Sequence, residues 1–219
     1  MKNFLKGCNF EIHLNTVQNE SFDGVAFLDR DGVIIKEKNY IKDPKQVELN
    51  DGIEKVLDFL YKKNFKIIVI TNQSGISRGY FDWEDYLAVT KKMLQLLDYK
   101  NKKNNLISSI YACGAINEND CNWRKPGIGM ISNACSEKFI NTKESILIGD
   151  KLSDIKAGKN SCINKLFHVL TGHGEKEKEK VRNYILNSTY NTDIKSKSLK
   201  QFFQLKDLEI IYQILKEII

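Results

Sequence analysis

The chain has 219 residues, 42% of them hydrophobic, and a net charge of +6 at neutral pH. This length suits one domain with its own core, and only two prolines and 13 glycines argue against a disordered or fibrous chain. The lysines are dispersed and no apolar run reaches transmembrane length, so neither a nucleic-acid partner nor a membrane partner is expected. Five irregularly spaced cysteines and the lack of a signal-peptide pattern favour a reduced, cytoplasmic protein, which we expect to be a monomer.

Residues 1–24 are interpreted as a polar leader of unknown role with a short strand near 10–17, and residues 25–219 as a single domain. Buried strands are predicted at 25–28, 66–70, 106–112, 145–148 and 165–170. Helices are predicted at 51–63 with Asp51 as its cap, at 83–98, at 128–139, at a short segment ending near 155–158, and at 206–219. Residues 33–50 and 113–126 are expected to be loops, and 172–199 a charged irregular segment. The alternation predicts a three-layer α/β/α, Rossmann-like fold with a mainly parallel sheet, right-handed crossovers and no large cap domain.

The most informative stretch is Val-Ala-Phe-Leu-Asp-Arg-Asp-Gly-Val, residues 25–33. It predicts a buried strand that ends at Asp29, followed by a turn with Asp31. Ligands of open α/β sheets bind at the carboxyl ends of the strands, and two carboxylates held close together there favour a cation between them. The stretch therefore indicates a Mg²⁺ site with a nucleophilic carboxylate beside an acid–base carboxylate, although an ordinary strand-to-turn junction also fits these residues alone.

Two later strand ends carry similar chemistry. Thr71 and Asn72 follow the second predicted strand, and Asp150 follows the fourth. Arg124 and Lys125 precede a predicted helix between them. A phosphoryl group needs hydroxyl, cationic and N–H donors, and Mg²⁺ needs oxygen ligands such as Asp29, Asp150 and the backbone carbonyl of Asp31. Each segment has an alternative interpretation as a turn, a surface charge or a helix cap, but their joint placement favours one phosphate-binding site.

Four motifs occur in order: Asp-Arg-Asp-Gly-Val (29–33), Thr-Asn-Gln-Ser-Gly-Ile-Ser-Arg-Gly (71–79), Arg-Lys-Pro (124–126) and Gly-Asp-Lys-Leu-Ser-Asp (149–154). Together they resemble the phosphatases of the haloacid dehalogenase superfamily, and within it the histidinol-phosphatase group. The resemblance covers about residues 25–173 and leaves out the leader and most of 174–199.

The resemblance implies a role for each motif. Asp29 would be the nucleophile that forms an aspartyl-phosphate, and Asp31 the acid–base residue. Thr71 and Lys125 would hold the phosphoryl oxygens, and Asp29, Asp31 and Asp150 would bind Mg²⁺. The residues implied to contact substrate are Glu37, Lys38, Asn39 and Tyr40 in the first loop, together with Asn72, Gln73, Ser74, Arg124 and Lys151.

The resemblance implies an intracellular phosphatase acting on a small phosphorylated sugar. The leading substrate is a heptose 1,7-bisphosphate that loses its 7-phosphate, in the supply of nucleotide-activated heptose for surface polysaccharide. Histidinol phosphate is the alternative, since the same motifs serve both. Removal of a 3′-phosphate from nucleic acid is less favoured because no basic, aromatic-lined groove is evident in the sequence. A catalytically inactive binding protein is disfavoured by the intact carboxylates and Lys125.

The chain departs from the family at one place. Members often carry zinc on Cys-x-His followed by Cys-x-Cys before Arg-Lys-Pro, whereas this chain has Cys113-Gly-Ala115 and Cys121-Asn-Trp123. Two of four ligands are therefore missing, and a structural zinc site normally has four. Zinc is expected to be absent or partial, with Asp120 or Glu118 as conceivable oxygen substitutes.

Overall fold

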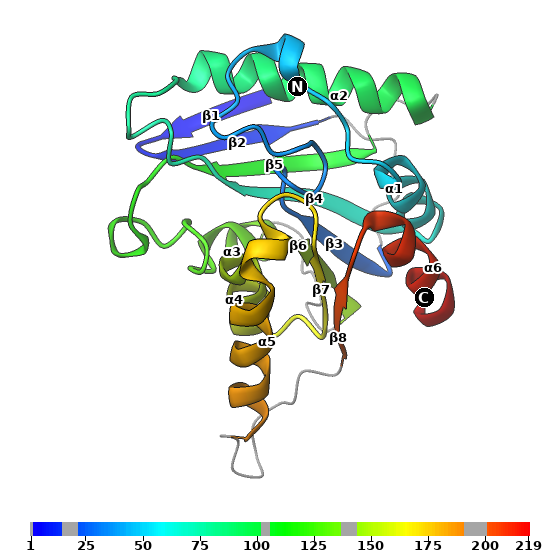
Figure 1. Ribbon diagram of the computed structural model, residues 1–219. Coiled ribbons are helices and arrows are strands. Elements are labelled where there is room, and N and C mark those ends of the chain that lie inside the picture. The colour runs from blue at the N-terminus through cyan, green and yellow to red at the C-terminus, as the bar shows by residue number, and fades with distance from the viewer. Residues whose placement is uncertain (1, 15–21, 102–105, 137–143, 191–200) are drawn as a thin grey trace.

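The computed structural model describes residues 2–14, 22–101, 106–136, 144–190 and 201–219. These residues form a single eight-stranded sheet with the strand order β1-β2-β5-β4-β3-β6-β7-β8 (Figure 1). The strands are β1 (Lys2–Lys6), β2 (Asn9–His13), β3 (Gly24–Leu28), β4 (Phe65–Asn72), β5 (Ile107–Cys113), β6 (Ile146–Gly149), β7 (Lys165–Val169) and β8 (Gln201–Leu205).

The sheet is parallel from β5 to β8, and the hairpin of β1 and β2 continues it antiparallel beyond β5. Strand β3 lies between β4 and β6, and all five of its residues are buried. Such an apolar strand needs helices on both of its faces. Its central position brings the residues that follow it next to those that follow β4 and β6.

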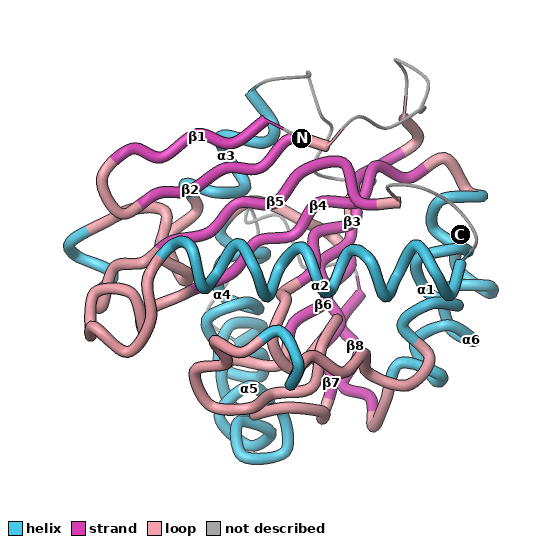
Figure 2. The backbone as a smooth tube through the Cα atoms, turned by 90° about the horizontal axis from the view of Figure 1, so that it is seen from above, coloured by secondary structure: helices cyan, strands magenta, loops and turns pink. Residues whose placement is uncertain are grey.

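Helices cover both faces of the sheet, as Figures 1 and 2 show. On one face lie α1 (Ile53–Lys62), α2 (Trp83–Asn101) and α6 (Leu208–Ile218), which share an apolar core with alternate residues of the strands. On the other lie α3 (Gly129–Ser136), α4 (Leu152–Asn160) and α5 (Gly174–Tyr190), which pack on the intervening strand residues. The predicted three-layer fold with a mainly parallel sheet is confirmed.

The five predicted strands and the predicted helices are present, with ends that differ by at most three residues where they are described. The cap of the first helix is a correction: its N-cap is Gly52, with φ of 84° and no side-chain hydrogen bond, rather than Asp51. Strands β1 and β8 were not predicted from the sequence. The strand predicted near 10–17 and the helix predicted at 128–139 are only partly described, because residues 15–17 and 137–139 lie outside the described residues.

The predicted irregular segment at 172–199 is wrong over most of its length, because residues 174–190 form α5. Ion pairs one turn apart, Glu175 with Lys178 and Glu177 with Lys180, support the helix. Val181 is fully buried against the sheet, so the segment also has an apolar side. The alternating charges indicate the solvent face of a helix rather than a lack of structure, and residues 191–199 lie outside the described part.

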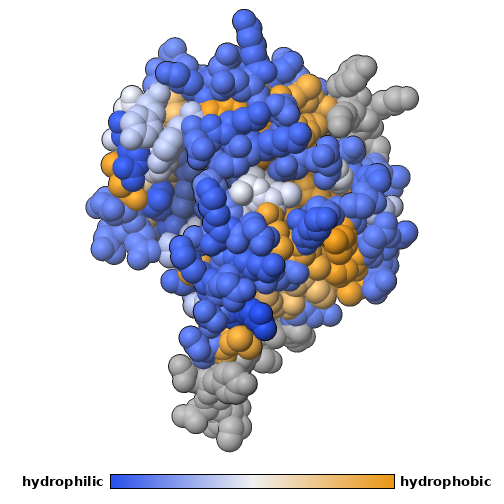
Figure 3. All heavy atoms as spheres, in the orientation of Figure 1, coloured by the Kyte–Doolittle hydropathy of each residue, from blue (hydrophilic) through white to orange (hydrophobic). Residues whose placement is uncertain are grey.

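The leader also proves to be structured. Residues 2–13 form the hairpin that extends the sheet, and Phe10 and Ile12 of β2 are buried in the core. The face seen in Figure 3 is mostly hydrophilic, with smaller apolar areas between the polar side chains. None of the helices in the described ranges is both long and apolar enough to cross a membrane.

Candidate active site

A cavity of about 690 Å³ opens at the carboxyl ends of the central strands. Segments after β3, β4, β5, β6 and β7 supply its lining, which includes Arg30, Asp31, Glu37, Asn39, Tyr40, Asn72, Gln73, Ser74, Arg124, Lys125, Lys151 and His173. Ten of the predicted site residues therefore surround one cavity. Asp29, Thr71 and Asp150 are buried at the same strand ends.

Asp29 and Lys125 form a buried ion pair at the end of β3. Lys125 Nζ lies 3.1 Å from Asp29 Oδ1 and 2.6 Å from Asp154 Oδ1, and it donates a 2.7 Å hydrogen bond to the carbonyl oxygen of Ile70. Burial raises the pKa of Asp29 and the charge of Lys125 acts against this rise. Lys125 stays charged, because the two carboxylates outweigh its burial and raise its pKa.

Asp31 is oriented by two neighbours. The guanidinium of Arg30 donates to both of its carboxylate oxygens at 3.1 Å, and Gln73 Nε2 donates to Oδ2 at 2.8 Å. Burial alone would raise the pKa of Asp31, but Arg30 and Gln73 outweigh it and hold the pKa below its ordinary value. Arg30 is itself 1% exposed and lies over the ring of Tyr86, 4.9 Å from its centre. Asp31 is therefore a fixed carboxylate that faces the cavity.

The turn after β4 positions its neighbours through side-chain amides. Asn72 makes a reciprocal pair with the backbone of Lys125, donating to its carbonyl at 2.9 Å and accepting from its N–H at 3.0 Å. Gln73 Nε2 also donates to Thr71 Oγ1 at 2.9 Å. Asn72 thus holds Lys125 in place, and Gln73 links Thr71 to Asp31.

Three carboxylates meet below the cavity. Oxygen atoms of Asp29, Asp150 and Asp154 lie within 4.8 Å of one another, and all three residues are buried. One oxygen of Asp150 accepts the backbone N–H of His173 at 2.7 Å, while Oδ1 has no hydrogen-bond partner among the described residues. A side chain at Gly32 would collide with the Asp150 carboxylate, so this approach requires glycine. An unpartnered buried carboxylate oxygen within an acidic group suits a hard cation such as Mg²⁺.

The first loop contributes unevenly. Glu37 Oε2 lies 3.7 Å from Lys151 Nζ and 3.3 Å from His173 Nδ1, so it connects the loop to the residues after β6 and β7. Asn39 and Tyr40 line the cavity with left-handed backbones, φ of 50° and 64°. Lys38 does not line the cavity, because it pairs with Glu48 at 2.8 Å on the surface. Its predicted substrate contact is not supported by this arrangement.

A sequence model described as polynucleotide kinase 3 phosphatase matches residues 24–205, most of the chain. The chain belongs to the polynucleotide kinase 3 phosphatase family. This agrees with the resemblance of its four motifs to haloacid dehalogenase superfamily phosphatases.

The curated relatives of this chain include proteins named as heptose-1,7-bisphosphate 7-phosphatases. It is 42% identical over 164 residues to the D-glycero-alpha-D-manno-heptose-1,7-bisphosphate 7-phosphatase of Photorhabdus laumondii, covering 70% of this chain and 86% of the relative. It is 33% identical over 183 residues to the D-glycero-beta-D-manno-heptose-1,7-bisphosphate 7-phosphatase of Haemophilus influenzae, covering 80% and 97%. The relatives thus include enzymes named for both anomers.

A solved structure shares the fold. The D,D-heptose 1,7-bisphosphate phosphatase from B. bronchiseptica, complexed with magnesium and phosphate, superimposes with a TM-score of 0.72 at 22% identity, covering 90% of this chain and 99% of that chain. At this identity the likeness establishes the fold alone.

Two residues of the site were missed from the sequence. Asp154 is part of the fourth motif, but it was not predicted to join Asp29 and Asp150 in the acidic group. Its position shortly after Asp150 is the signal in the sequence that could have indicated this. His173 was not singled out at all; it follows β7, whose carboxyl end lies beside that of β6. Looking for polar residues after every predicted strand would have found it.

Proposed function

We propose that the protein is a Mg²⁺-dependent phosphatase that removes the 7-phosphate of D-glycero-D-manno-heptose 1,7-bisphosphate through an aspartyl-phosphate. The observation that carries the proposal is the group of Asp29, Lys125 and the two further carboxylates at one sheet edge, directly below a cavity of metabolite size. The names of the curated relatives support the choice of substrate. The product would serve the synthesis of nucleotide-activated heptose for surface polysaccharide.

In the first step, a carboxylate oxygen of Asp29 attacks phosphorus and the bond from phosphorus to the sugar oxygen breaks. Asp31 gives its proton to the departing sugar oxygen. Although its pKa is low in the free protein, the negative charge of a bound phosphate raises the pKa of a neighbouring carboxyl and favours the protonated form. The pair of Arg30 and Gln73 keeps this carboxyl aimed at the cavity.

In the second step, Asp31 takes a proton from a water molecule, and the resulting hydroxide attacks the phosphoryl group on Asp29. The bond from phosphorus to Asp29 breaks, and inorganic phosphate leaves. Lys125 supplies positive charge beside Asp29, and the Thr71 hydroxyl, which accepts from Gln73, has its own proton to donate to a phosphoryl oxygen.

Asp29, Asp150 and the backbone carbonyl of Asp31 would hold Mg²⁺, with Asp154 beside them. When bound, the ion would neutralise charge on the phosphoryl oxygens and bring Asp29 and phosphate together. The donors suit this ion, because hard carboxylate and carbonyl oxygens are the ligands that Mg²⁺ prefers.

The lining of the cavity favours a small substrate over a nucleic acid. Arg124 and Lys151 provide positive charge for a phosphorylated sugar, but Glu37 and Glu118 also line the cavity and would repel a polyanion. The described loops around the cavity are short, with no inserted cap domain between Asp31 and Lys125. We therefore place histidinol phosphate second and a nucleic-acid 3′-phosphate last.

The test is phosphate release by the purified protein with Mg²⁺, using both anomers of the heptose bisphosphate, histidinol phosphate and a 3′-phosphorylated oligonucleotide. We expect the highest kcat/KM with one heptose bisphosphate anomer. A higher value for histidinol phosphate or for the oligonucleotide would overturn the substrate assignment. No release above that of an Asp29→Asn variant with any substrate would overturn the phosphatase assignment itself.

A further inference from the structure

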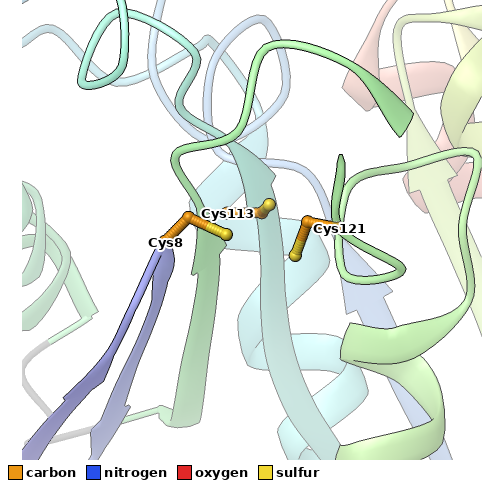
Figure 4. A group of neighbouring side chains, drawn as sticks. All are labelled: Cys8, Cys113 and Cys121. Carbon is orange, nitrogen blue, oxygen red and sulfur yellow. The ribbon is translucent and has the colours of Figure 1, made fainter. Parts of the chain in front are cut away.

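Three cysteines from distant parts of the chain meet beside the carboxyl end of β5. Cys8 lies in the turn between β1 and β2, Cys113 at the end of β5 and Cys121 in the following loop. Their sulfur atoms all lie within 4.8 Å of one another, and Figure 4 shows the three side chains pointing toward a common centre. All three are free thiols.

The backbone places these cysteines together. Asn9 pairs with Cys113 in the register of β2 and β5, so Cys8 is next to the end of β5. The carbonyl oxygen of Cys8 accepts a 2.8 Å hydrogen bond from the N–H of Gly114. The juxtaposition therefore follows from main-chain pairing of the hairpin with β5 rather than from flexible side chains.

The surroundings of the thiols suit thiolate ligands. The backbone N–H groups of Trp123 and Arg124 are hydrogen-bond donors to the Cys121 sulfur. The backbone N–H of Ala115 is likewise a donor to the Cys113 sulfur. Donors aimed at sulfur are the partners that a metal-bound thiolate requires around it.

An oxygen atom is also directed at the group. The thiols of Cys121 and Cys8 both donate to Asn9 Oδ1, at 3.0 Å and 3.4 Å. This amide oxygen, or a water in its place, is available for a fourth ligand position. Neither Asp120 nor Glu118 belongs to the group among the described residues, so the oxygen substitutes considered from the sequence do not complete it.

We propose that Cys8, Cys113 and Cys121 form a binding site for a thiophilic divalent cation, with Zn²⁺ as the preferred ion. Three thiolates with one oxygen provide the tetrahedral, sulfur-rich ligand set that Zn²⁺ prefers over Mg²⁺. Cys8 replaces one of the two ligands that the loop at 113–123 lacks, so the N-terminal hairpin takes part in the site. Cys8 and Cys121 are partly exposed, which leaves a path for the ion.

The bound ion would connect the hairpin to one wall of the cavity. Residues Ile116 to Asn119, between Cys113 and Cys121, line the cavity described above. A metal bridge from Cys8 to both ends of this loop would restrict its motion. The proposal does not depend on which substrate the cavity accepts.

The test measures metal directly. Protein purified under reducing conditions is stripped with a chelator, reloaded with Zn²⁺, desalted and assayed for bound zinc; a parallel sample is loaded with Co²⁺, whose thiolate complexes absorb in the near ultraviolet. We expect one Zn²⁺ per chain, a thiolate-to-cobalt absorption band and a higher Tm for the loaded protein than for the stripped protein.

The variant Cys8→Ser separates this site from one made by the loop alone. We expect it to bind zinc at least about 100-fold more weakly, because a ligand is lost. Cys135→Ser, a partly buried thiol of α3 outside the group, is the matched control and should bind zinc like the wild type. If Cys8→Ser is unfolded by circular dichroism, Cys8→Ala replaces it.

Three results would overturn the proposal: no zinc in the reloaded wild type, undiminished zinc affinity in Cys8→Ser, or loss of zinc in Cys135→Ser as well. Formation of a Cys8–Cys121 disulfide in the reducing preparation, detected by mass spectrometry without bound metal, would also overturn it.

Discussion

Replacing Arg30 by methionine should destabilise the protein and change its pH dependence together. The Arg30 side chain is 1% exposed and donates to both oxygens of Asp31, to Gln73 Oε1 at 3.2 Å and to Thr90 Oγ1 at 3.4 Å. Removing one partner of a buried pair typically costs about 3 to 5 kcal/mol. Because Asp31 keeps Gln73 and is 14% exposed, we expect the lower end, about 3 kcal/mol.

The sign of the pH effect follows from the lowered pKa of Asp31. A carboxyl with a depressed pKa in the folded state stabilises the protein above its unfolded value, 3.8, and this contribution is lost as the pH falls through the folded value. The variant lacks most of this contribution, so its deficit in unfolding free energy should be largest near neutral pH and shrink below pH 3.8. In the variant the pKa of Asp31 should rise because Arg30 is missing. If Asp31 is the acid that protonates the leaving group, this rise should also move the alkaline limb of the kcat/KM profile to higher pH.

Urea unfolding at several pH values and the pH profile of kcat/KM provide the two measurements. Arg182→Met, which removes an exposed arginine of α5, is the matched control and should change the unfolding free energy by less than about 0.5 kcal/mol. A loss below about 1 kcal/mol for Arg30→Met, together with an unmoved alkaline limb, would refute the inference that Arg30 sets the state of Asp31.

Three further predictions address the site. Asp29→Asn should remain folded, because the amide is nearly isosteric, but lose more than about 90% of kcat, equivalent to about 1.4 kcal/mol of barrier; a variant retaining a tenth of wild-type kcat or more contradicts the nucleophile assignment. Lys38→Ala should change KM by less than about twofold, because Lys38 pairs with Glu48 on the surface, so a large rise in KM would mean that the first loop moves when substrate binds. EDTA treatment should abolish activity and Mg²⁺ alone should restore it, in a coupled phosphate assay; failure of Mg²⁺ to restore any activity would count against the acidic group as its site.

The position of the site could be predicted because it depends on short-range patterns. Asp29, Thr71 and Asp150 each follow an apolar run that reads as a buried strand, and parallel strands bring such ends to one edge. The hydrogen-bond partners of the polar side chains at that edge could not be predicted. Asn72 and Gln73 were both assigned to substrate, yet in the structure they hold Lys125 and Asp31, partners 53 and 42 residues away. Side-chain partners at such separations depend on strand order, which the pattern of one strand does not contain.

The two errors in the C-terminal part of the chain have separate physical causes. Helix α5 was predicted as irregular because only one side of it is buried and its exposed residues dominate the composition. Strand β8 was missed because its residues are only half-buried, at the edge of the sheet next to β7. Edge strands and partly exposed helices take much of their stability from tertiary packing. Their hydrophobic pattern in the sequence is therefore weaker than that of a fully buried strand such as β3.

The cysteines show how one missed pairing alters an inference about chemistry. From spacing alone, Cys113 and Cys121 represent half of a site, and zinc was therefore doubted. A short strand was predicted near residues 10–17, but the sequence does not show beside which strand it lies. Once β2 pairs with β5, its register places Cys8 beside Cys113, and a residue more than 100 positions from Cys121 joins the same group. Missing ligands in a local motif therefore do not exclude a metal site where an added hairpin can supply another.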